Sequence, residues 1–499
     1  MSKIFKNIPI ILLLSGLLLV GLRVYKDYGI SWDGPGQRKY GTDIYNYITG
    51  ENKKLLKNKD RYYGTTSELL LMVVEKTFHF EDIKQIYEMR HLLTFLIYFQ
   101  GVLFFYLLCG NIFKSKTFAT LGTLFFVLSP RIFAHAFYNS KDIPFLAFFI
   151  TTTYFSLKFI QKQNLKNTIL AGIFTAILVT TRVVGILLPG LVFFIFGIKY
   201  FQTKKFPNIK IIGLYMIITV LLIYALWPTL WGNPLKEFGN ALEQMAKYPQ
   251  QTAGIYLGKK VKSTQVPWHY TPVFLAVTTP LMYTLAFLLG FVFYTKDLIS
   301  KKLNLNLFLI FGWFLAPLIA VIYFRSTLYD AWRQMFFVYP AFLVISIFGI
   351  MNLYKNFNKP LKILLSLLIM FQLGIVLNFM IRWHPFQNVY YSELAGKKEN
   401  IEKTWELDYW GIAYKQGLEF LEKYSDKETI IISSQNYPGE NNLKMLENRD
   451  RFKFIKSIGA SDYFLTNFRA NLKKTKEGYE EIHTIRVEGY KILAIYKVK

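Results

Sequence analysis

The sequence predicts a polytopic α-helical membrane protein with about eleven transmembrane helices and a small C-terminal α/β domain. Hydrophobic residues make up 53% of the 499 residues and charged residues only 18%, which is more apolar than an ordinary soluble enzyme. Aromatic residues reach 18%, and Trp and Tyr favour the membrane–water interface. Apolar runs about one bilayer crossing long recur through residues 1–382, whereas residues 383–499 have a soluble composition.

Eleven apolar runs predict the membrane helices. The first resembles a signal peptide, but no small-residue cleavage site follows it, so we expect an uncleaved helix. Most runs cover roughly 17–23 residues, about one bilayer crossing. They lie near 8–25, 91–109, 117–133, 143–160, 167–181, 183–199, 210–228, 272–294, 305–324, 335–351 and 361–380.

The lysines predict the direction of these spans. The connectors "NIFKSKT", "KFIQKQNLKN", "KYFQTKKFPNIK", "YTKDLISKKLN" and "YKNFNKPLK" each carry two or more lysines. With the N-terminus inside and eleven spans, all five fall in the cytoplasm, as the positive-inside rule requires. This count needs two crossings in residues 167–199, separated at Arg182. We therefore expect a multi-pass protein of the plasma (inner) membrane, with a cytoplasmic N-terminus and residues 383–499 outside the cytoplasm.

The net charge of +27 does not indicate a nucleic-acid-binding protein. No basic stripe alternates with aromatic residues on one polar face, so we expect no nucleic acid among the partners. The single cysteine, Cys109, lies inside an apolar run. An intrachain disulfide and a zinc cluster are therefore excluded.

The outer face carries arginines, acids and aromatic residues where the inner face carries lysines. Its long connectors are residues 27–90 and 229–271. In the first of these, "RKYGTDIYNYIT" and "SELLLMVVEKTF" have helical periodicity and predict short helices, either on the membrane surface or packed on the tail. In the tail, "YKQGLEFLEKY" predicts a helix, "TIIISS" and "FKFI" predict strands, and "EEIHTIRVEGYKILAIYKVK" predicts a hairpin.

One acid stands out in the first outer loop, in the stretch "GISWDGPGQRKYG". Asp33 follows Trp32 and precedes a turn that Pro35 fixes and that Gly34 and Gly36 loosen. A carboxylate can accept a proton or hold a metal. The simpler alternative is that Asp33 is solvated and has no catalytic or binding role.

A second acid, Asp142, and a set of cations lie at the points where neighbouring spans reach the outer face. Asp142 lies in "YNSKDIP", and Asp142 with Lys141 could simply cap a helix. Arginine forks match phosphate oxygens, so we expect these cations to bind the phosphate of a lipid carrier, although Arg325 and Arg333 could instead be interfacial anchors. For His135 and His269 hydrogen-bonded packing is favoured over metal ligation. The expected carrier-phosphate-binding residues are Arg131, Lys141, Arg182, Arg325 and Arg333.

Together these motifs resemble the GT-C glycosyltransferases, and more narrowly the group of protein O-mannosyltransferases and lipid A aminoarabinose transferases. The resemblance rests on the N-terminal helix, the acidic motif that opens a large outer loop, "SPRIFAHAFYNSKDIP" and "LYDAWRQMFFVYPAF". The segments "HPFQNVYYSELAG" and "ELDYWGIAYKQGLEFL" are similar to a bacterial subgroup. The resemblance covers about residues 1–425.

The resemblance implies an inverting glycosyltransferase, hexosyl or pentosyl, that moves a sugar from a polyprenyl-phosphate carrier in the bilayer to a protein, lipid or glycan acceptor outside the membrane. It implies Asp33 as the catalytic base. Gly34 stands where many relatives have another acid, so we expect Asp142 to be the second catalytic acid. The Asp-x-Asp metal motif of oligosaccharyltransferases is absent from the outer loops, so no cofactor is expected, and a divalent metal stays open. The expected substrate-binding residues are Trp32, Tyr138, Asn139, His384 and Tyr390.

Three other interpretations stay open. A transporter of lipid-linked sugars would place its ionisable residues near mid-membrane, whereas here they lie at one face. A polysaccharide polymerase or ligase would also use outer arginines and lipid-linked sugars, but it would not need the acid-bearing first loop. A non-catalytic membrane scaffold would hold its partners through the tail.

Overall fold

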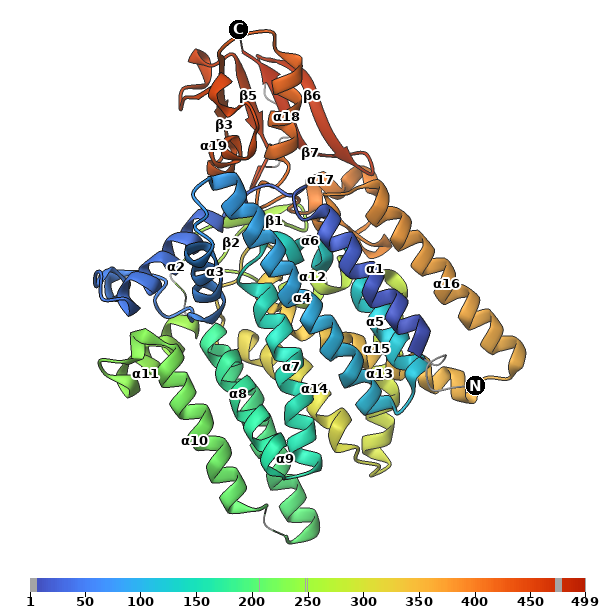
Figure 1. Cartoon of the computed structure of the whole chain (residues 1–499). Helices are drawn as coiled ribbons and strands as arrows, with labels where there is room; N and C mark the ends of the chain where they lie inside the picture. Colours follow the sequence, from blue (N-terminus) through green and yellow to red (C-terminus); the bar gives the residue numbers. More distant parts are fainter. Residues whose placement is uncertain (1–6, 206, 247, 249, 472–477, 499) are drawn as a thin grey trace.

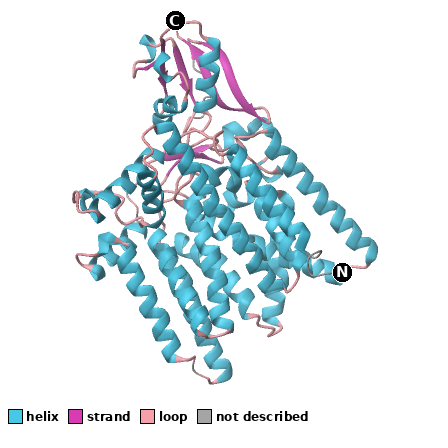
Figure 2. Ribbon diagram, in the orientation of Figure 1, coloured by secondary structure: helices cyan, strands magenta, loops and turns pink. Residues whose placement is uncertain are grey.

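Long helices from residues 8–382 form a bundle, and a five-stranded sheet domain stands on one end of it (Figures 1 and 2). This computed structural model describes residues 7–205, 207–246, 248, 250–471 and 478–498. The C-terminus of α9 (Leu187–Thr203) and the N-terminus of α10 (Ile209–Leu226) lie at the end of the bundle opposite the sheet domain (Figure 1). Helices α2 and α3 flank the end that carries the sheet domain.

Each of the eleven expected apolar runs contains a helix. Within the described residues, eight helices are long and apolar enough to cross a membrane, and α5 with α6 makes a ninth candidate as a bent pair. The apolar helices α1 and α8 are shorter, at 17 residues each. The prediction of a polytopic helical membrane protein is confirmed. The helices are α1 (Ile8–Val24), α4 (Ile83–Phe113), α5 (Lys116–Val127), α6 (Pro130–Tyr138), α7 (Asp142–Gln161), α8 (Leu165–Thr181), α9 (Leu187–Thr203), α10 (Ile209–Leu226), α13 (Leu281–Ile299), α14 (Leu305–Tyr323), α15 (Tyr339–Asn356) and α16 (Lys359–Arg382).

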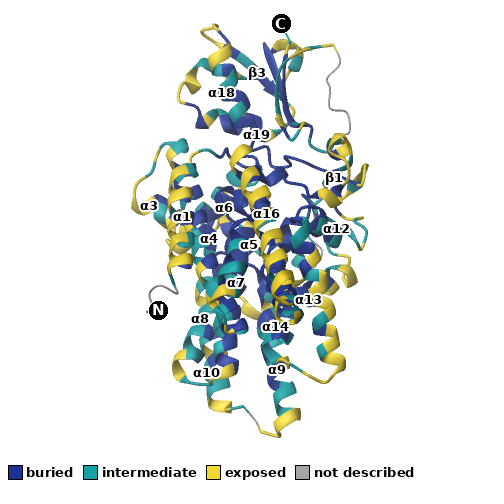
Figure 3. Cartoon of the chain, turned by 90° about the vertical axis from the view of Figure 1, so that its right-hand side faces the viewer, coloured by how far each residue is buried: buried dark blue, intermediate teal, exposed yellow. Residues whose placement is uncertain are grey.

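Burial separates the centre of the bundle from its rim (Figure 3). The apolar windows of α7 and of the span Arg333–Asn356, which joins η5 (Arg333–Val338) to α15, are 78% and 89% buried, whereas that of α10 is 11% buried. The rim helices expose large apolar side chains such as Leu221, Met370 and Phe371. An apolar surface of this extent is stable only against lipid or another apolar partner.

Polar residues in the short connectors begin the helices. A side-chain oxygen at the N-cap accepts a hydrogen bond from a backbone N–H that has no partner within the first turn. The structure shows this cap at Asp82, Ser115, Asn164, Asn208, Asn304 and Asn358.

The run expected at 117–133 is not one straight helix. It breaks after α5, and α6 follows at an angle of 64°. Pro130 has no N–H and fits only the first turn of a helix, so a new helix begins there. All nine residues of α6 are buried, so this stretch runs through the interior of the protein.

The first long connector forms α2 (Gly34–Ile48), η2 (Lys54–Lys57) and α3 (Thr66–Thr77). The two short α-helices predicted there are confirmed. The expected turn after Asp33 is wrong, because Gly34, Pro35 and Gly36 form the first turn of α2 and Asp33 is its N-cap residue. Proline suits a turn and the first turn of a helix equally well, so the sequence alone could not separate the two.

The second long connector packs against the same end of the bundle. It contains η4 (Pro228–Leu230), α11 (Pro234–Ala246), a hairpin of β1 (Ala253–Tyr256) and β2 (Lys259–Lys262), and α12 (Tyr270–Val277). Tyr256 of β1 bridges to Trp405 in the C-terminal region, which joins this connector to the tail.

The C-terminal domain contains the sheet β4-β3-β5-β7-β6. Strand β3 runs parallel to β4 and β5, and β7 runs antiparallel to β5 and β6. The helix, the strands and the hairpin predicted in the tail are confirmed, whereas β5 and α19 were not anticipated. The elements are α17 (Ile401–Thr404), α18 (Tyr414–Tyr424), β3 (Ile430–Ser434), α19 (Tyr437–Asn442), η9 (Leu443–Met445), β4 (Phe452–Phe454), β5 (Tyr463–Thr466), β6 (Glu480–Val487) and β7 (Tyr490–Lys497).

Candidate active site

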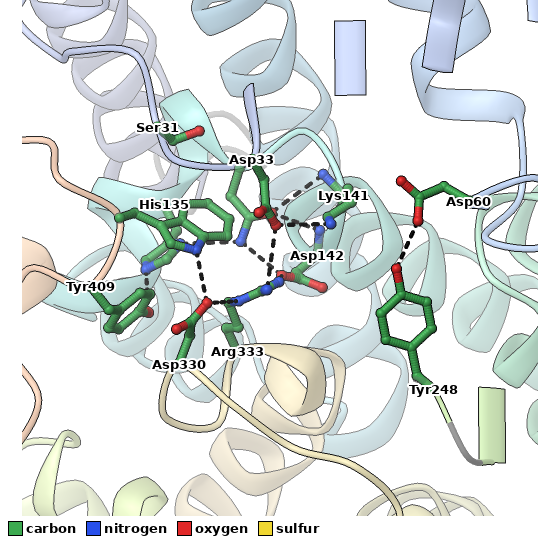
Figure 4. Close-up of polar contacts among 12 residues, drawn as sticks. Ser31, Asp33, Asp60, His135, Lys141, Asp142, Tyr248, Asp330, Arg333 and Tyr409 are labelled. Atoms are coloured by element: carbon green, nitrogen blue, oxygen red, sulfur yellow. Dashed lines mark hydrogen bonds and ion pairs between the residues drawn. The ribbon is translucent and has the colours of Figure 1, made fainter. Parts of the chain in front are cut away.

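Three carboxylates and four cations meet at the end of the bundle that carries the sheet domain. They come from the N-terminus of α2, the start of α7, the break after α8, the segment around η5 (Arg333–Val338), and the C-terminal domain. Figure 4 labels five of them: Asp33, Lys141, Asp142, Asp330 and Arg333. Four positive charges against three negative ones leave one positive charge without a carboxylate. We call this group the charged cluster; its members are Asp33, Lys141, Asp142, Arg182, Asp330, Arg333 and Arg469.

Arg333 is the centre of the charged cluster. Its Nη1 donates to Asp142 Oδ2 at 3.0 Å, its Nε donates to Asp330 Oδ2 at 3.3 Å, and its Nη2 lies 3.3 Å from Asp33 Oδ2. The rings of Tyr329 and Trp410 each lie 4.8 Å from its guanidinium carbon. The side chain is 1% exposed, so Arg333 is a buried cation rather than an interfacial anchor.

Asp142 is buried and fully engaged. Arg182 donates to Oδ1 at 2.5 Å, and Arg333 and Asn139 donate to Oδ2 at 3.0 and 3.1 Å. Only 2% of the side chain is exposed. Both oxygens already accept bonds, so this carboxylate holds two arginines in place and does not act as a simple helix cap.

Asp33 is the more open acid. Its side chain is 23% exposed, and Lys141 Nζ lies 2.9 Å from Oδ2. Burial acts to raise the pKa of the Asp33 carboxyl, but the positive charges of Lys141, Arg333 and Arg469 outweigh burial and hold this pKa well below its usual value. Asp33 is therefore ionised at any physiological pH.

Three contacts position the Asp33 loop. The Ser31 hydroxyl donates to the carbonyl oxygen of Tyr138 at 3.2 Å, and the backbone N–H of Trp32 donates to the carbonyl oxygen of Trp410 at 3.0 Å. The Asn442 side chain accepts from the N–H of Ile30 at 2.8 Å and donates to its carbonyl oxygen at 3.0 Å. Helix α6 and the C-terminal domain therefore clamp the loop from two sides.

A buried ion pair holds the segment that precedes α7 in place. Glu68 of α3 accepts from Arg90 of α4 and from the Ser140 hydroxyl, both at 2.5 Å. Ser140 directly precedes Lys141, so this pair locates the start of α7. Glu68 and Arg90 were not recognised in the sequence, because each lies in an ordinary amphipathic pattern.

Two adjoining cavities border the charged cluster. The polar cavity, about 350 Å³, is lined by Asp33, Lys141, Asp330 and Arg469 among others. The apolar cavity, about 200 Å³, lies between the segment 182–187 that begins with Arg182, the end of α14 with the connector that follows it, and η5. Both cavities share Tyr248 and Tyr329. The hydroxyl of Tyr248 donates to Asp60 at 2.7 Å (Figure 4), which fixes it at the boundary between them.

Two members of the charged cluster were missed in the sequence. Asp330 lies in the stretch "LYDAWRQMFFVYPAF", where it and Ala331 have positive φ angles of 56° and 57°. Arg469 belongs to the C-terminal domain; its Nη2 donates to Asp330 Oδ1 at 2.7 Å, and its guanidinium carbon lies 4.2 Å from the Trp32 ring centre. No local pattern marks Arg469, because only the docking of the sheet domain brings it to the site.

Several expected site residues lie near the charged cluster without joining it. Asn139 bonds Asp142, and the ring of Tyr138 packs on His135. Arg131 of α6 donates to the carbonyl oxygen of Tyr390 at 3.3 Å and makes no ion pair with the cluster acids within the described residues. These side chains form the wall behind the site.

Other expected residues lie in separate places. His384 bonds Asp27 at 2.8 Å, and the Tyr390 ring packs on Phe379. Arg325, at a positive φ of 49°, lines a different hollow of about 560 Å³ beside α14. Among the described residues that line the polar cavity, none of these three is present.

The histidines make hydrogen bonds, as expected. His135 Nε2 lies 2.9 Å from the Tyr409 hydroxyl, and His269 Nδ1 lies 2.6 Å from the Tyr256 hydroxyl. Within the residues that the structure describes, no group of three His, Cys, Asp or Glu is arranged to hold a metal ion. The acids of the charged cluster instead face cations.

Comparisons with known proteins agree on the fold. Residues 88–231 match the family model described as dolichyl-phosphate-mannose-protein mannosyltransferase. The structure is similar to that of ArnT from Cupriavidus metallidurans bound to undecaprenyl phosphate, with a TM-score of 0.51 and 11% identity over 97% of both chains. No curated protein matches the sequence.

Two larger enzymes are also similar in structure. The oligosaccharyltransferase of Archaeoglobus fulgidus has a TM-score of 0.46 and 12% identity, over 80% of this chain and 57% of that one. The arabinofuranosyltransferase AftD from mycobacteria has a TM-score of 0.44 and 10% identity, over all of this chain and 40% of that one. The resemblance predicted from the sequence is confirmed: the chain has the GT-C glycosyltransferase fold, and its residues 88–231 match the mannosyltransferase family model.

Proposed function

We propose that this chain is an inverting glycosyltransferase that moves a sugar from a polyprenyl-phosphate carrier to an acceptor on the outer face of the membrane. One observation carries the proposal: an ionised, partly exposed carboxylate faces a cavity that is also lined by cations and that adjoins an apolar cavity. A lipid-linked sugar phosphate needs all three features. The undecaprenyl phosphate in the ArnT structure supports the same class of carrier.

The two cavities bind different parts of the carrier. The phosphate-proximal part of the polyprenyl tail occupies the apolar cavity beside the end of α14. The phosphate lies at the boundary, near Arg182 of the apolar cavity and Lys141 of the polar one, and the buried Arg333 lies behind them, paired with Asp142. Burial of the tail supplies apolar binding energy, and charge-assisted hydrogen bonds to the phosphate fix its position. Asp142 holds Arg182 and Arg333 in this arrangement, so its role is to position cations.

Asp33 is the base in this scheme. Its carboxylate takes the proton of the acceptor hydroxyl, whose oxygen attacks the anomeric carbon of the sugar as the carbon–oxygen bond to phosphate breaks. The bonding electrons leave with the phosphate, and the surrounding cations stabilise that developing charge. Attack opposite the leaving group inverts the anomeric centre.

The charge of the donor makes Asp33 a stronger base. In the free protein, cations hold the pKa of Asp33 well below its usual value, and such a carboxylate is a weak base. A bound phosphodiester adds a negative charge beside Lys141 and Arg333, which raises the pKa of Asp33 by about one unit or more. The base is thus activated only when the donor is present.

This coupling predicts two different pH profiles. Activity is lost as pH falls through the pKa of Asp33, so the acid limb of kcat, which reports the donor complex, should lie at higher pH than the acid limb of kcat/KM, which reports the free enzyme. Steady-state rates at varied donor concentration, taken from pH 8 down to the lowest pH at which the protein stays folded, follow both parameters. Because the pKa of Asp33 in the free protein lies well below its usual value, kcat/KM should still be flat at the pH where kcat begins to fall. Coincident acid limbs would contradict the coupling.

The C-terminal domain should contribute to donor use through Arg469. Replacing Arg469 by Gln removes a cation from the polar cavity and should raise the donor KM roughly tenfold or more, the effect of one lost charge-assisted hydrogen bond. Arg486→Gln, in β6 of the same domain, removes an equal charge from a side chain that bonds only the Gly489 carbonyl among its described contacts. Equal kinetics in the two variants would show that Arg469 is only structural.

Topology is a separate prediction of the proposal. A reporter that is active only outside the cytoplasm should be active after residue 499 and silent at Lys204, because the lysine connectors stay inside. A stably expressed C-terminal fusion that is silent would place the charged cluster in the cytoplasm.

The proposal is tested with purified protein and a panel of polyprenyl-phosphate sugars. A transferase of this kind releases free polyprenyl phosphate when an acceptor is present, and the released carrier is measured by mass spectrometry. A transporter would move the intact lipid across proteoliposomes without cleavage, a polymerase would release polyprenyl diphosphate, and a scaffold would do neither.

A further inference from the structure

A large cavity lies where the end of α16 meets the C-terminal domain (Figure 1). It has a volume of about 990 Å³ and is lined by the last turns of α16, the loop 390–401 and the turn between β6 and β7. Among the described residues, none that lines this cavity also lines the polar or the apolar cavity. We call it the interface cavity; its charged lining residues are Arg382, Glu393, Lys397, Lys398, Glu399 and Glu488.

The interface cavity lies at the level where α16 leaves the bilayer. The apolar window of α16 is only 28% buried, and Ile381, next to its C-terminus, is 70% exposed. Arg382 and Trp383 follow, with the guanidinium carbon of Arg382 at 5.1 Å from the Trp383 ring centre. Arginine and tryptophan at the end of a membrane helix favour the headgroup layer. A lipid that packs against α16 therefore places its headgroup at the cavity.

The lining of the interface cavity carries charges of both signs in equal number. Lys398 pairs with Glu488 at 2.5 Å. The other two cations and two acids of the lining are exposed, and within the described residues none of them makes an ion pair. A site that presents unpaired charges of both signs is complementary to a zwitterion rather than to an anion.

A polar side chain on the exposed side of α16 also lines the cavity. Asn378 is exposed and makes no hydrogen bond within the part of the chain that the structure describes. Its neighbours Ile375 and Leu377 are exposed and apolar. An amide beside lipid costs free energy unless it is hydrogen-bonded. The ester carbonyl oxygens of a phospholipid lie just below its headgroup and can accept a bond from the Asn378 amide.

Acids from two segments converge on Tyr390. Burial raises the pKa of the Tyr390 hydroxyl, and the nearby carboxylates of Glu393 and Glu488 raise it further. Glu393 belongs to the loop 390–401 and Glu488 to the turn between β6 and β7, so carboxylates from both segments face this part of the cavity. A cationic group is favoured there.

We infer that the interface cavity binds the headgroup of phosphatidylethanolamine and that this lipid joins the C-terminal domain to the bundle. The phosphate lies against Arg382 and Lys397, and the ammonium lies against Glu393 and the acids beside it. A primary ammonium has three N–H donors for carboxylates, which the quaternary ammonium of phosphatidylcholine lacks. The inference does not depend on the transferase reaction, because the lipid is neither the sugar donor nor the acceptor.

An anionic phospholipid fits the cavity less well. The phosphate of phosphatidylglycerol could pair with the two cations, but its headgroup has no positive charge for the acids. Glu393 and Glu399 would then stay unpaired beside a negatively charged lipid, and like charges repel. The preference for an ammonium headgroup therefore depends on the acids of the lining.

The test combines charge variants with lipid headgroups. The detergent-solubilised full chain is incubated with mixed micelles that contain equal amounts of phosphatidylethanolamine and phosphatidylglycerol, and the lipid retained per chain is measured by mass spectrometry. The wild type should retain phosphatidylethanolamine preferentially. Arg382→Gln/Lys397→Gln should bind it roughly five- to tenfold more weakly, as two exposed ion pairs allow. Glu393→Gln/Glu399→Gln should lose the preference, because only the contacts to the ammonium are removed.

A matched control and a crosslinking probe locate the site. Lys423→Gln/Lys453→Gln removes two exposed charges elsewhere on the C-terminal domain and should retain lipid like the wild type. A photoreactive phosphatidylethanolamine should crosslink to peptides within residues 378–401. Stronger retention of phosphatidylglycerol by the wild type, an unchanged preference in the acid variant, or crosslinks confined to other helices would overturn the inference.

Discussion

Replacing Asp33 by Asn should reduce sugar transfer about 10²-fold or more while the protein still folds and inserts. Asparagine keeps the shape of the side chain and can still accept a bond from Lys141, which lies 2.9 Å away, but it cannot take a proton. The donor KM should change little, because the cations that bind the phosphate remain. Single-turnover measurement of carrier release with saturating donor isolates the chemical step.

Two further variants make this result specific. Asp60→Asn alters another acid of the polar cavity, one that bonds Tyr248, and it should cost much less activity than Asp33→Asn. Asp33→Ala leaves room for a small anion, so added formate should restore part of the lost rate. Near-normal turnover of Asp33→Asn would show that another group is the base.

The fold was largely predictable because it depends on local and repetitive features. Each membrane helix is an apolar run ended by a polar connector, and a single Asn or Ser in the connector caps α5, α8, α10, α14 and α16. The break at Arg182 was predicted from charge balance alone, and the structure places Arg182 between α8 and η3 (Val183–Ile186). The bend at Pro130 was missed, since hydropathy does not distinguish one long helix from two.

The candidate site was predictable only in part, because its members meet through tertiary packing. Arg325 and Arg333 lie in the same connector and were equivalent in the sequence. Positive φ angles at Arg325, Asp330 and Ala331 fold this connector back on itself, so that Arg333 enters the charged cluster while Arg325 lines another hollow. Arg469 lies more than a hundred residues further along the chain, and no periodicity connects it to Asp33.

Replacing Arg333 by Gln should have the largest effect on the protein as a whole. It removes the cation that contacts Asp33, Asp142 and Asp330 and leaves buried negative charge uncompensated, which costs about 3–5 kcal/mol of stability. Carrier affinity should also fall by about 1.5–3 kcal/mol. Thermal unfolding and carrier binding measure the two losses, and Arg325→Gln, which makes the same change in the same connector, should show neither.

A double variant separates stability from catalysis at this position. In Arg333→Gln/Asp142→Asn both members of the 3.0 Å pair are neutral, so most of the lost stability should return, because the penalty comes from an unpaired buried charge rather than from the missing bond. Transfer should stay at least about 10²-fold below wild type, because the cation that stabilises the departing phosphate is still absent. Recovery of transfer together with stability would mean that Arg333 supports the fold alone and that Lys141, Arg182 and Arg469 suffice to hold the carrier.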